Sequence, residues 1–139
     1  MNERREPFSA DAFIDLASIE NFSWWFRSRN HIIIWALRRF VPEFRDFLEV
    51  GCGTGFVLQG VSRAFPTVQL KGSEYFDEGL VHARERIPQA EFIQLDARLM
   101  TYTVSHDVIG AFDVIEHIEE DELVLNNLAN ALRSGGSLL

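Results

Sequence analysis

The chain has 139 residues, of which 47% are apolar and 24% charged, a composition typical of one globular domain and not of a disordered chain. Its 13 basic and 21 acidic side chains give a net charge of -8, which repels polyanions, so nucleic acid is not expected as a partner. The longest apolar run, Ile32 to Leu37, is far shorter than the roughly 18 residues that a membrane span needs, so no membrane partner is expected either.

The N-terminal part of the chain predicts two helices. Apolar side chains between positions 13 and 19 follow helical spacing after Ser9, which is a suitable N-cap. A second helix is predicted from about Ser28 to Phe40, because the residue before Pro42 disfavours helical geometry.

An aromatic cluster at residues 22–26 lies between these helices, and two interpretations are equally open: packing beneath the helices, or facing a ligand. The charge balance changes after the second helix. Residues 1–48 carry seven basic and seven acidic side chains, whereas residues 49–139 carry six and fourteen. The sequence therefore predicts an N-terminal helical segment at residues 1–45 and a second unit at residues 46–139.

From residue 47 onward, short β-rich runs alternate with helical stretches, which is the signature of βαβ units and a parallel α/β sheet. Strands are predicted at Phe47–Val50, Gln69–Glu74, Glu91–Leu95 and Asp107–Asp113, with helices at Phe56–Ala64, Asp77–Arg86 and Glu120–Leu132. The last helix is expected to stop at Ser134-Gly135-Gly136, and a fifth strand to begin at Ser137. Because the chain stops two residues later, the domain is expected to be truncated inside that strand.

A glycine-rich turn, Gly51 to Gly55, is predicted where the first strand meets its helix. Such a turn lets the backbone approach a nucleotide-like ligand. The dinucleotide fingerprint Gly-x-Gly-x-x-Gly requires glycine at the position held here by Phe56. This argues against a bound pyrophosphate and against a nicotinamide-dependent oxidoreductase.

Acidic residues stand at the ends of three predicted strands. Glu74 can accept hydrogen bonds from ribose hydroxyls, and Asp96 can accept one from an exocyclic amine such as that of adenine. Together with Glu49, these carboxylates are expected to ring one crevice at the carboxyl side of the sheet, where open α/β sheets bind ligands. An adenosine ligand with a cationic part suits that crevice better than a pyrophosphate.

Class I S-adenosylmethionine-dependent methyltransferases have a first motif that resembles residues 47–55, Phe47-Leu48-Glu49-Val50-Gly51-Cys52-Gly53-Thr54-Gly55. Further matches follow in order at Glu74, at Leu95-Asp96-Ala97, at Phe112-Asp113-Val114-Ile115-Glu116-His117-Ile118 and at Leu132-Arg133-Ser134-Gly135-Gly136. The block Trp24-Trp25-Phe26-Arg27-Ser28-Arg29 is similar to the N-terminal helices of some bacterial small-molecule methyltransferases.

The resemblance implies a Rossmann-like, doubly wound parallel sheet in strand order 3-2-1-4-5, incomplete here, with the N-terminal helices capping the cofactor site. It implies S-adenosylmethionine as the cofactor, S-adenosylhomocysteine as its product and a small-molecule methyl acceptor. The implied cofactor-binding residues are Glu49, Gly51, Cys52, Gly53, Gly55, Glu74, Tyr75, Asp96, Ala97 and Asp113. Glu49 would hold the ammonium of the methionine part, and Ala97 would present its backbone N–H to adenine.

His117 is the candidate general base, because Glu116 and His117 form the acid/base pair closest to where an acceptor would meet the methyl group. The alternative is a solvated loop histidine. Cys52 is not expected to act as a nucleophile, since no base is positioned beside it. Asp113 could instead be an acid at a helix start. The other histidines lack metal-ligand spacing, so no metal is expected.

The expected function is therefore S-adenosylmethionine-dependent methyl transfer to a small molecule, and the alternative is a non-catalytic cofactor-binding or interaction fragment. A fifth strand at the sheet edge exposes unpaired backbone groups, which predicts self-association. The single cysteine, Cys52, and an N-terminus without a secretory signal predict a cytoplasmic location.

Overall fold

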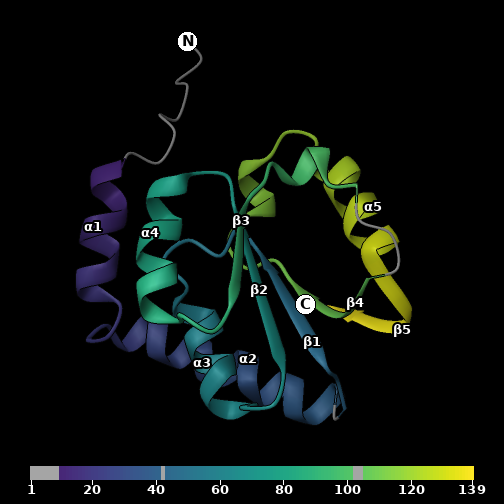
Figure 1. Ribbon diagram of the computed structural model, residues 1–139, viewed down its shortest axis with the longest axis horizontal. Helices are drawn as coiled ribbons and strands as arrows, with labels where there is room; N and C mark the ends of the chain where they lie inside the picture. The colour runs from purple at the N-terminus through teal and green to yellow at the C-terminus, as the bar shows by residue number, and fades with distance from the viewer. Residues whose placement is uncertain (1–9, 42, 102–104) are drawn as a thin grey trace.

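The computed structural model describes residues 10–41, 43–101 and 105–139, in which an entirely parallel five-stranded sheet carries helices on both faces (Figure 1). The strands are β1 (Asp46–Val50), β2 (Gln69–Glu74), β3 (Glu91–Gln94), β4 (His106–Gly110) and β5 (Leu132–Leu138). The α-helices are α1 (Ala10–Ile19), α2 (Trp24–Phe40), α3 (Phe56–Ala64), α4 (Asp77–Arg86) and α5 (Asp121–Ala131), with short 3-10 helices η1 (Ala97–Leu99) and η2 (Ile115–His117). The order β3-β2-β1-β4-β5 confirms the predicted Rossmann-like sheet.

The central strand β1 separates two hydrophobic clusters. Phe47 packs in the cluster formed with α2, α3 and α4, whereas Leu48 and Val50 pack in the cluster formed with α5. Because side chains alternate along a strand, Glu49 shares the face of Phe47 and points toward the α2–α3 side. The alternation of side chains along β1 therefore places the Glu49 carboxylate on the side of α2 and α3 and not on the side of α5.

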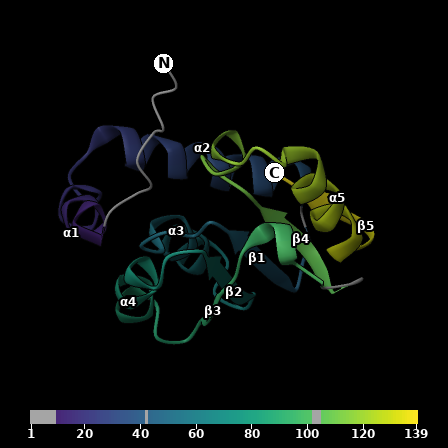
Figure 2. The ribbon, with the colours of Figure 1, turned by 90° about the horizontal axis from the view of Figure 1, so that it is seen from above.

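The N-terminal helices pack directly on the second part of the chain. Helix α1 contacts α4, and α2 contacts α3, as the two views in Figures 1 and 2 show. The Nδ2 group of Asn30 donates a 2.9 Å hydrogen bond to the carbonyl oxygen of Phe56. A Cβ at Gly60 would lie 2.8 Å from the same Nδ2, so the glycine permits the close approach of the two helices.

Helix α2 begins at Trp24, four residues before the predicted start at Ser28. The ring of Phe26 packs edge-on against that of Phe56, with 6.1 Å between centroids, which holds the first turn in place. This tertiary contact extends the helix through a run of aromatic residues that has no strong intrinsic helical preference. The predicted N-cap of α1, Ser9, lies outside the described residues.

The aromatic cluster at residues 22–26 is mostly not buried. Phe22, Trp24 and Trp25 are 86%, 75% and 54% exposed. Packing beneath the helices is therefore the wrong interpretation for these three side chains, and it holds for Phe26, which contacts Phe56.

The junction of α5 and β5 differs from the prediction. Helix α5 ends at Ala131, and β5 starts at Leu132 instead of Ser137. The register shifts between the pairs His106–Leu132 and Val108–Ser137. The glycines of the predicted turn therefore lie in an irregular stretch inside the strand. Gly135 lies there with a φ of 79°. The helix does not use this glycine as its stop, because strand pairing begins first.

Strand β4 ends at Gly110, three residues before the predicted end at Asp113. A Cβ at Gly110 would lie 2.5 Å from the ring of Phe112, so the chain folds back closely at this point. Asp113 has a φ of 55°, which takes it out of extended geometry. Residues 111–120, which join β4 to α5 and are called the β4 loop, are thereby turned toward the glycine-rich segment.

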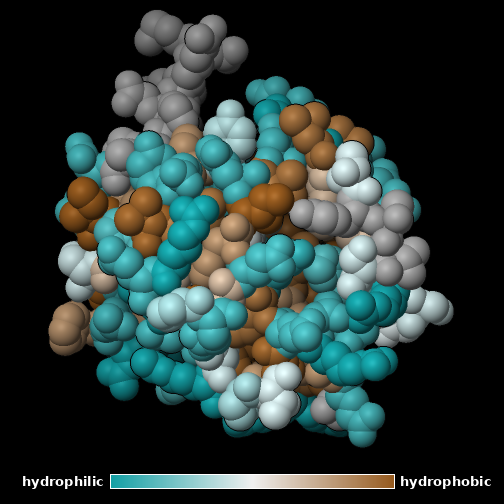
Figure 3. All heavy atoms as spheres, in the orientation of Figure 1, coloured by the Kyte–Doolittle hydropathy of each residue, from teal (hydrophilic) through white to brown (hydrophobic). Residues whose placement is uncertain are grey.

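The face seen in Figure 3 has hydrophobic atoms reaching the surface near its middle, surrounded by hydrophilic side chains. None of the helices in the described ranges combines the length and the apolar character that a bilayer crossing requires.

Candidate functional site

The glycine turn, residues 51–55, joins β1 to α3 at the carboxyl edge of the sheet. Gly51, Gly53 and Gly55 have φ values of 70°, 51° and 79°, which non-glycine residues rarely adopt. A Cβ at Gly51 would lie 2.6 Å from Cγ2 of Val114, so the turn sits against the β4 loop. The backbone N–H of Cys52 donates to the carbonyl oxygen of Ser73 at 2.9 Å, which fixes the turn to β2.

Glu74, at the end of β2, lies directly beside this turn. Its Oε2 accepts the backbone N–H of Gly53 at 2.8 Å, and its Oε1 accepts those of Tyr75 at 2.8 Å and Phe76 at 3.2 Å. Three backbone donors therefore orient the buried carboxylate. A carboxylate offers about four acceptor positions, so one remains for a hydroxyl of a ligand.

A buried acid, Glu49, and a half-buried base, Arg29, lie close enough behind the turn to interact electrostatically. Glu49 is 2% exposed and its Oε2 has no hydrogen-bond partner among the described residues. Burial raises the pKa of Glu49 well above its ordinary value, and the positive charge of Arg29 partly offsets this effect. The Nε of Arg29 is likewise buried without a hydrogen-bond partner within the described ranges. Unmatched buried donors and acceptors are costly in a folded protein, so an ordered water or a ligand is needed to complete them.

Arg29 also forms an ion pair with Asp113, which connects α2 to the β4 loop. Asp113 is therefore tied to α2 at the position just before Val114, which lies against Gly51. The η2 helix that follows has Val114 at its N-cap, without a side-chain cap, and α5 has Glu120 there. Asp113 lies one residue before the N-cap of η2 and is not itself the N-cap of either helix.

A hollow of about 500 Å³ lies among the residues that follow Glu74 and the end of β3. It is lined by Tyr75, Phe76, Asp77, Glu78, Gln94 and Asp96. The Nε2 of Gln94 donates to the carbonyl oxygen of Tyr75 at 2.9 Å, which supports one wall. Three carboxylates and two aromatic rings suit a neutral or cationic ring system and oppose a phosphate. A second hollow, of about 460 Å³, lies at the opposite end of β2 and β3, beside Gln69 and Glu91.

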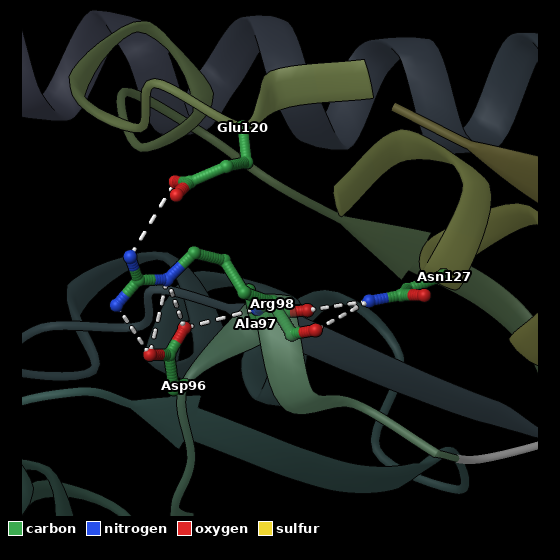
Figure 4. Close-up of polar contacts among 5 residues, drawn as sticks. All are labelled: Asp96, Ala97, Arg98, Glu120 and Asn127. Atoms are coloured by element: carbon green, nitrogen blue, oxygen red, sulfur yellow. Dashed lines mark hydrogen bonds and ion pairs between the residues drawn. The ribbon is translucent and has the colours of Figure 1, made fainter. Parts of the chain in front are cut away.

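Asp96 is already paired in this structure. Its carboxylate accepts hydrogen bonds from Nε of Arg98 at 3.0 Å and from Nη2 of Arg98 at 2.7 Å. The Nη1 of Arg98 also donates to Glu120 at 3.4 Å (Figure 4). The hydrogen bonds from the Arg98 side chain lower the pKa of Asp96. The carboxylate is therefore ionised at neutral pH and its acceptor positions are partly occupied.

The backbone beside Asp96 is fixed from α5. The Nδ2 of Asn127 donates to the carbonyl oxygens of Ala97 and Arg98 at 3.1 Å and 3.0 Å, as Figure 4 shows. Ala97 itself is buried at the start of η1. Its backbone is thereby held at the edge of the hollow.

A buried network ties the N-terminal segment to the glycine turn. Glu20, 3% exposed, accepts the hydroxyl of Thr54 at 2.6 Å and an Nη1 hydrogen bond from Arg86 at 2.8 Å. The ring of Phe13 packs over the same turn, 4.0 Å from where a Cβ of Gly53 would stand. Helix α1 and its following corner thus pack against the glycine turn.

Two of the predicted site residues, Cys52 and His117, have their side chains in the hydrophobic core and on the exposed surface, respectively. The thiol of Cys52 is buried in the core beside β2, where burial raises its pKa and the charges of Glu49 and Glu74 raise it further. Only its backbone can face a ligand. His117 is exposed at the end of η2, in the β4 loop. In the part of the chain that the structure describes, no group of three or more His, Cys, Asp or Glu side chains could hold a metal.

Sequence reasoning missed Arg29, Glu20 and Phe13. The partners of these residues lie far along the chain: Arg29 reaches Asp113, and Glu20 reaches Thr54 and Arg86. The one available signal was the resemblance of the block at residues 24–29 to the N-terminal helices of some bacterial small-molecule methyltransferases, which indicates the position of Arg29 but no function for it. An isolated acid such as Glu20 gives no signal of burial until the helices are placed.

Comparison with known proteins identifies residues 48–138 as a match to the methyltransferase domain family. A probable S-adenosylmethionine-dependent methyltransferase of Mycobacterium tuberculosis is 33% identical over 127 residues, covering 87% of this chain and 42% of that protein. A trans-aconitate 2-methyltransferase of Variovorax paradoxus is 31% identical over 99 residues, covering 70% and 38%. The chain thus spans about two-fifths of the length of these relatives.

Solved structures share the fold. A crystal structure of an S-adenosyl-L-methionine-dependent methyltransferase from Methanococcus maripaludis superposes with a TM-score of 0.84 at 16% identity, covering 99% of this chain and 65% of that one. An amino pentose methyltransferase from Micromonospora echinaspora, solved with S-adenosylmethionine bound, gives 0.76 at 23% identity, covering 99% and 57%.

Proposed function

This chain belongs to the methyltransferase domain family, and on that premise we propose that it binds S-adenosylmethionine at the glycine turn and supplies the cofactor-binding half of a small-molecule methyltransferase. The observation that carries the proposal is the pair of buried polar atoms without a hydrogen-bond partner among the described residues, Oε2 of Glu49 and Nε of Arg29, next to the turn. Relatives that are methyltransferases by name, among them the M. tuberculosis protein, support it.

The amino-acid end of the cofactor is a zwitterion, and the side chains of Glu49 and Arg29 match its charges. The Glu49 carboxylate would receive the ammonium, and the Arg29 guanidinium would receive the carboxylate. Asp113 is a carboxylate that already occupies part of the Arg29 fork, so it stands where the ligand group would compete. The glycines between these groups leave room for backbone contact with the methionine chain.

The adenosine end fits the opposite side of the turn. Glu74 keeps an acceptor position for a ribose hydroxyl, in line with the role that the motif resemblance assigns to it. Adenine would enter the hollow beside Tyr75, with Asp96 accepting its exocyclic amine and Ala97 donating its backbone N–H. Arg98 would have to yield one of its contacts with Asp96 for this to happen.

S-adenosylmethionine supplies an activated methyl group when bound, so the protein has to provide position, orientation and exclusion of water. The turn and the β4 loop provide position through the contact of Gly51 with Val114. Phe13 and the α1–α2 corner exclude water on one side. His117, in the same loop, would accept the acceptor's proton as general base.

A small-molecule acceptor is supported by relatives named for such substrates, among them trans-aconitate and an amino pentose. We further propose a cytoplasmic location, consistent with a single cysteine held as a buried thiol. Copies of the chain would associate through the open edge of β5. The bulge and glycine of that strand shorten its regular part, so the association would be weak.

The test is calorimetric titration of the 139-residue chain with S-adenosylmethionine and S-adenosylhomocysteine, with NADH as the control ligand. We expect both sulfur ligands to bind and NADH not to bind. Arg29→Gln should weaken both, whereas Arg84→Gln, an exposed arginine on α4, should change neither. Preference for NADH, or equal affinities for the Arg29→Gln variant and the parent chain, would contradict the site.

Methyl transfer itself is tested separately, with the acceptors of the named relatives offered to the chain and to a relative of full length. Sedimentation at rising concentration tests the association. A strictly monomeric profile would contradict pairing through β5.

A further inference from the structure

Helix α2 differs in charge from the rest of the molecule. It contains four arginines, Arg27, Arg29, Arg38 and Arg39, and no acidic residue. The whole chain has 13 basic and 21 acidic side chains, so everything outside this helix holds 9 basic and 21 acidic ones. The helix is a concentrated positive element on an acidic protein.

One face of α2 points away from the sheet. Trp24, Ser28, His31 and Trp35 are spaced by three or four residues, which places them on one side of the helix, and Ile32 and Arg39 adjoin them. All six are exposed, with Trp24, Ile32 and Trp35 at 75%, 63% and 59%. We call these six residues the outer face. The opposite side buries Asn30, Ile33 and Leu37.

Three of the four arginines of α2 form no ion pair with any carboxylate of the described residues. Within the described residues, no ion pair joins Arg27, Arg38 or Arg39 to a carboxylate, although Arg29 pairs with Asp113. Arg38 and Arg39 lie over the rings of Phe65 and Phe40, at 5.9 Å and 5.5 Å from the centroids. Their charges remain available to an outside partner.

We propose that the outer face of α2 docks on an anionic lipid surface. Exposed tryptophans flanked by arginines on a helix lying at the edge of the molecule suit the interface of a bilayer, where indole rings insert among headgroups and guanidinium groups meet lipid phosphates. Figures 1 and 2 both place α2 at an outer edge. Pairing of two α2 outer faces in a symmetric dimer is disfavoured, because the same positive charges would meet.

This docking needs no spanning segment, and the lack of one was the basis for expecting no membrane partner. The net charge of -8 does not prevent it, because charges farther than about 8–10 Å are largely screened at physiological salt. The inference is independent of methyl transfer. Docking through the outer face would bring the candidate cofactor site close to the lipid surface, because Arg29 of that site lies on the inner side of the same helix.

The experiment measures binding of the 139-residue chain to vesicles of phosphatidylcholine alone and of phosphatidylcholine with phosphatidylglycerol. We expect binding to the anionic vesicles only, with a blue shift of tryptophan emission and weakening by added salt. The double variant Arg38→Gln/Arg39→Gln should bind at least ten-fold more weakly, since each arginine near such a surface contributes about five-fold. Trp24→Ser/Trp35→Ser should bind weakly as well.

The matched control is Arg63→Gln/Arg84→Gln, which removes the same charge from exposed positions on α3 and α4. It should bind as the parent chain does. Equal loss in the control, no preference for anionic vesicles, or a dimer in sedimentation that the Trp24→Ser/Trp35→Ser variant abolishes would each overturn the proposal. Circular dichroism establishes that every variant is folded before it is compared.

Discussion

The carboxylate of Glu20 accepts the hydroxyl of Thr54 at 2.6 Å, so the corner between α1 and α2 is joined directly to the glycine turn. The same carboxylate pairs with Arg86 at the end of α4, at 2.8 Å, and both side chains are largely buried. One acid thus links three segments that are far apart in sequence. It is a positioning residue for the turn, since it acts through Thr54.

Replacing Glu20 by Ala should lower the free energy of unfolding by about 3–5 kcal/mol, because Arg86 is left buried without its partner. Urea denaturation measures this. The control is Asp77→Ala, which removes an exposed ion pair with Arg84 and should cost less than about 1 kcal/mol. Equal costs for the two variants would show that the buried pair has no special weight.

Replacing Glu74 by Ala should weaken binding of S-adenosylmethionine, because charge-assisted hydrogen bonds are worth roughly 1.5 to 3 kcal/mol each. The backbone N–H groups of Gly53 and Tyr75 would also lose their acceptor. Titration calorimetry gives the affinities. Glu85→Ala, an exposed acid on α4 that does not line the hollow, is the control of equal charge. Unchanged affinity for the Glu74 variant would remove this residue from the site.

Glu49→Gln should separate stability from binding. The raised pKa of buried Glu49 means that the folded state holds its proton more tightly than the unfolded state, whose pKa is about 4.3. Stability is therefore lost as the pH rises above about 4.3 toward the raised value, by about 1.4 kcal/mol for every unit by which the pKa is raised. The glutamine variant avoids this loss.

We therefore expect Glu49→Gln to be more stable than the parent chain at pH 7 and equal to it near pH 4, while it binds S-adenosylmethionine more weakly because the ammonium loses its counter-charge. Urea denaturation at both pH values and calorimetry measure the two effects. Glu122→Gln, at an exposed position on α5, should change neither. Weaker binding without the gain in stability would show that Glu49 ionises at no cost in the free protein.

Gly51→Ala and Gly53→Ala compare strain with steric exclusion. Both residues have positive φ, which costs an alanine about 1–2 kcal/mol. Only Gly51 also faces Val114, whose Cγ2 would lie 2.6 Å from the new Cβ, whereas Gly53 has Phe13 at 4.0 Å. Thermal unfolding should show a clearly lower Tm for Gly51→Ala than for Gly53→Ala. Equal Tm values would mean that the β4 loop yields freely.

Much of the sheet could be predicted because its signals are local. The bounds of α3, β2 and α4 agree with the sequence-based prediction, since the glycine turn fixes where α3 begins and Pro88 follows the end of α4. The predicted end of α5 lies within one residue of the observed one, but the start of β5 was wrong, because pairing with β4 draws Leu132 into a strand before the glycines are reached. Competition between a helix stop and a distant strand is not visible in a local pattern.

The site was predicted in part for the same reason. Glu74 was expected at the crevice from its place at the end of a strand, and its bond to Gly53 places it at the glycine turn. The sequence does not decide between the two interpretations of the tryptophans, because burial of an aromatic run depends on which side of the helix meets α3. Arg29 was missed because its role follows from a residue 84 positions later.

The alternation along β1 limits how this protein can vary in length. Phe47 and Glu49 face α2 and α3, while Leu48 and Val50 face α5. A deletion of one residue within this strand would turn every following side chain to the opposite face. The carboxylate of Glu49 would then lie beneath α5, away from Arg29, and Val50 would take its place behind the glycine turn. Changes in length can therefore be tolerated in the segments between the elements, but not within this strand.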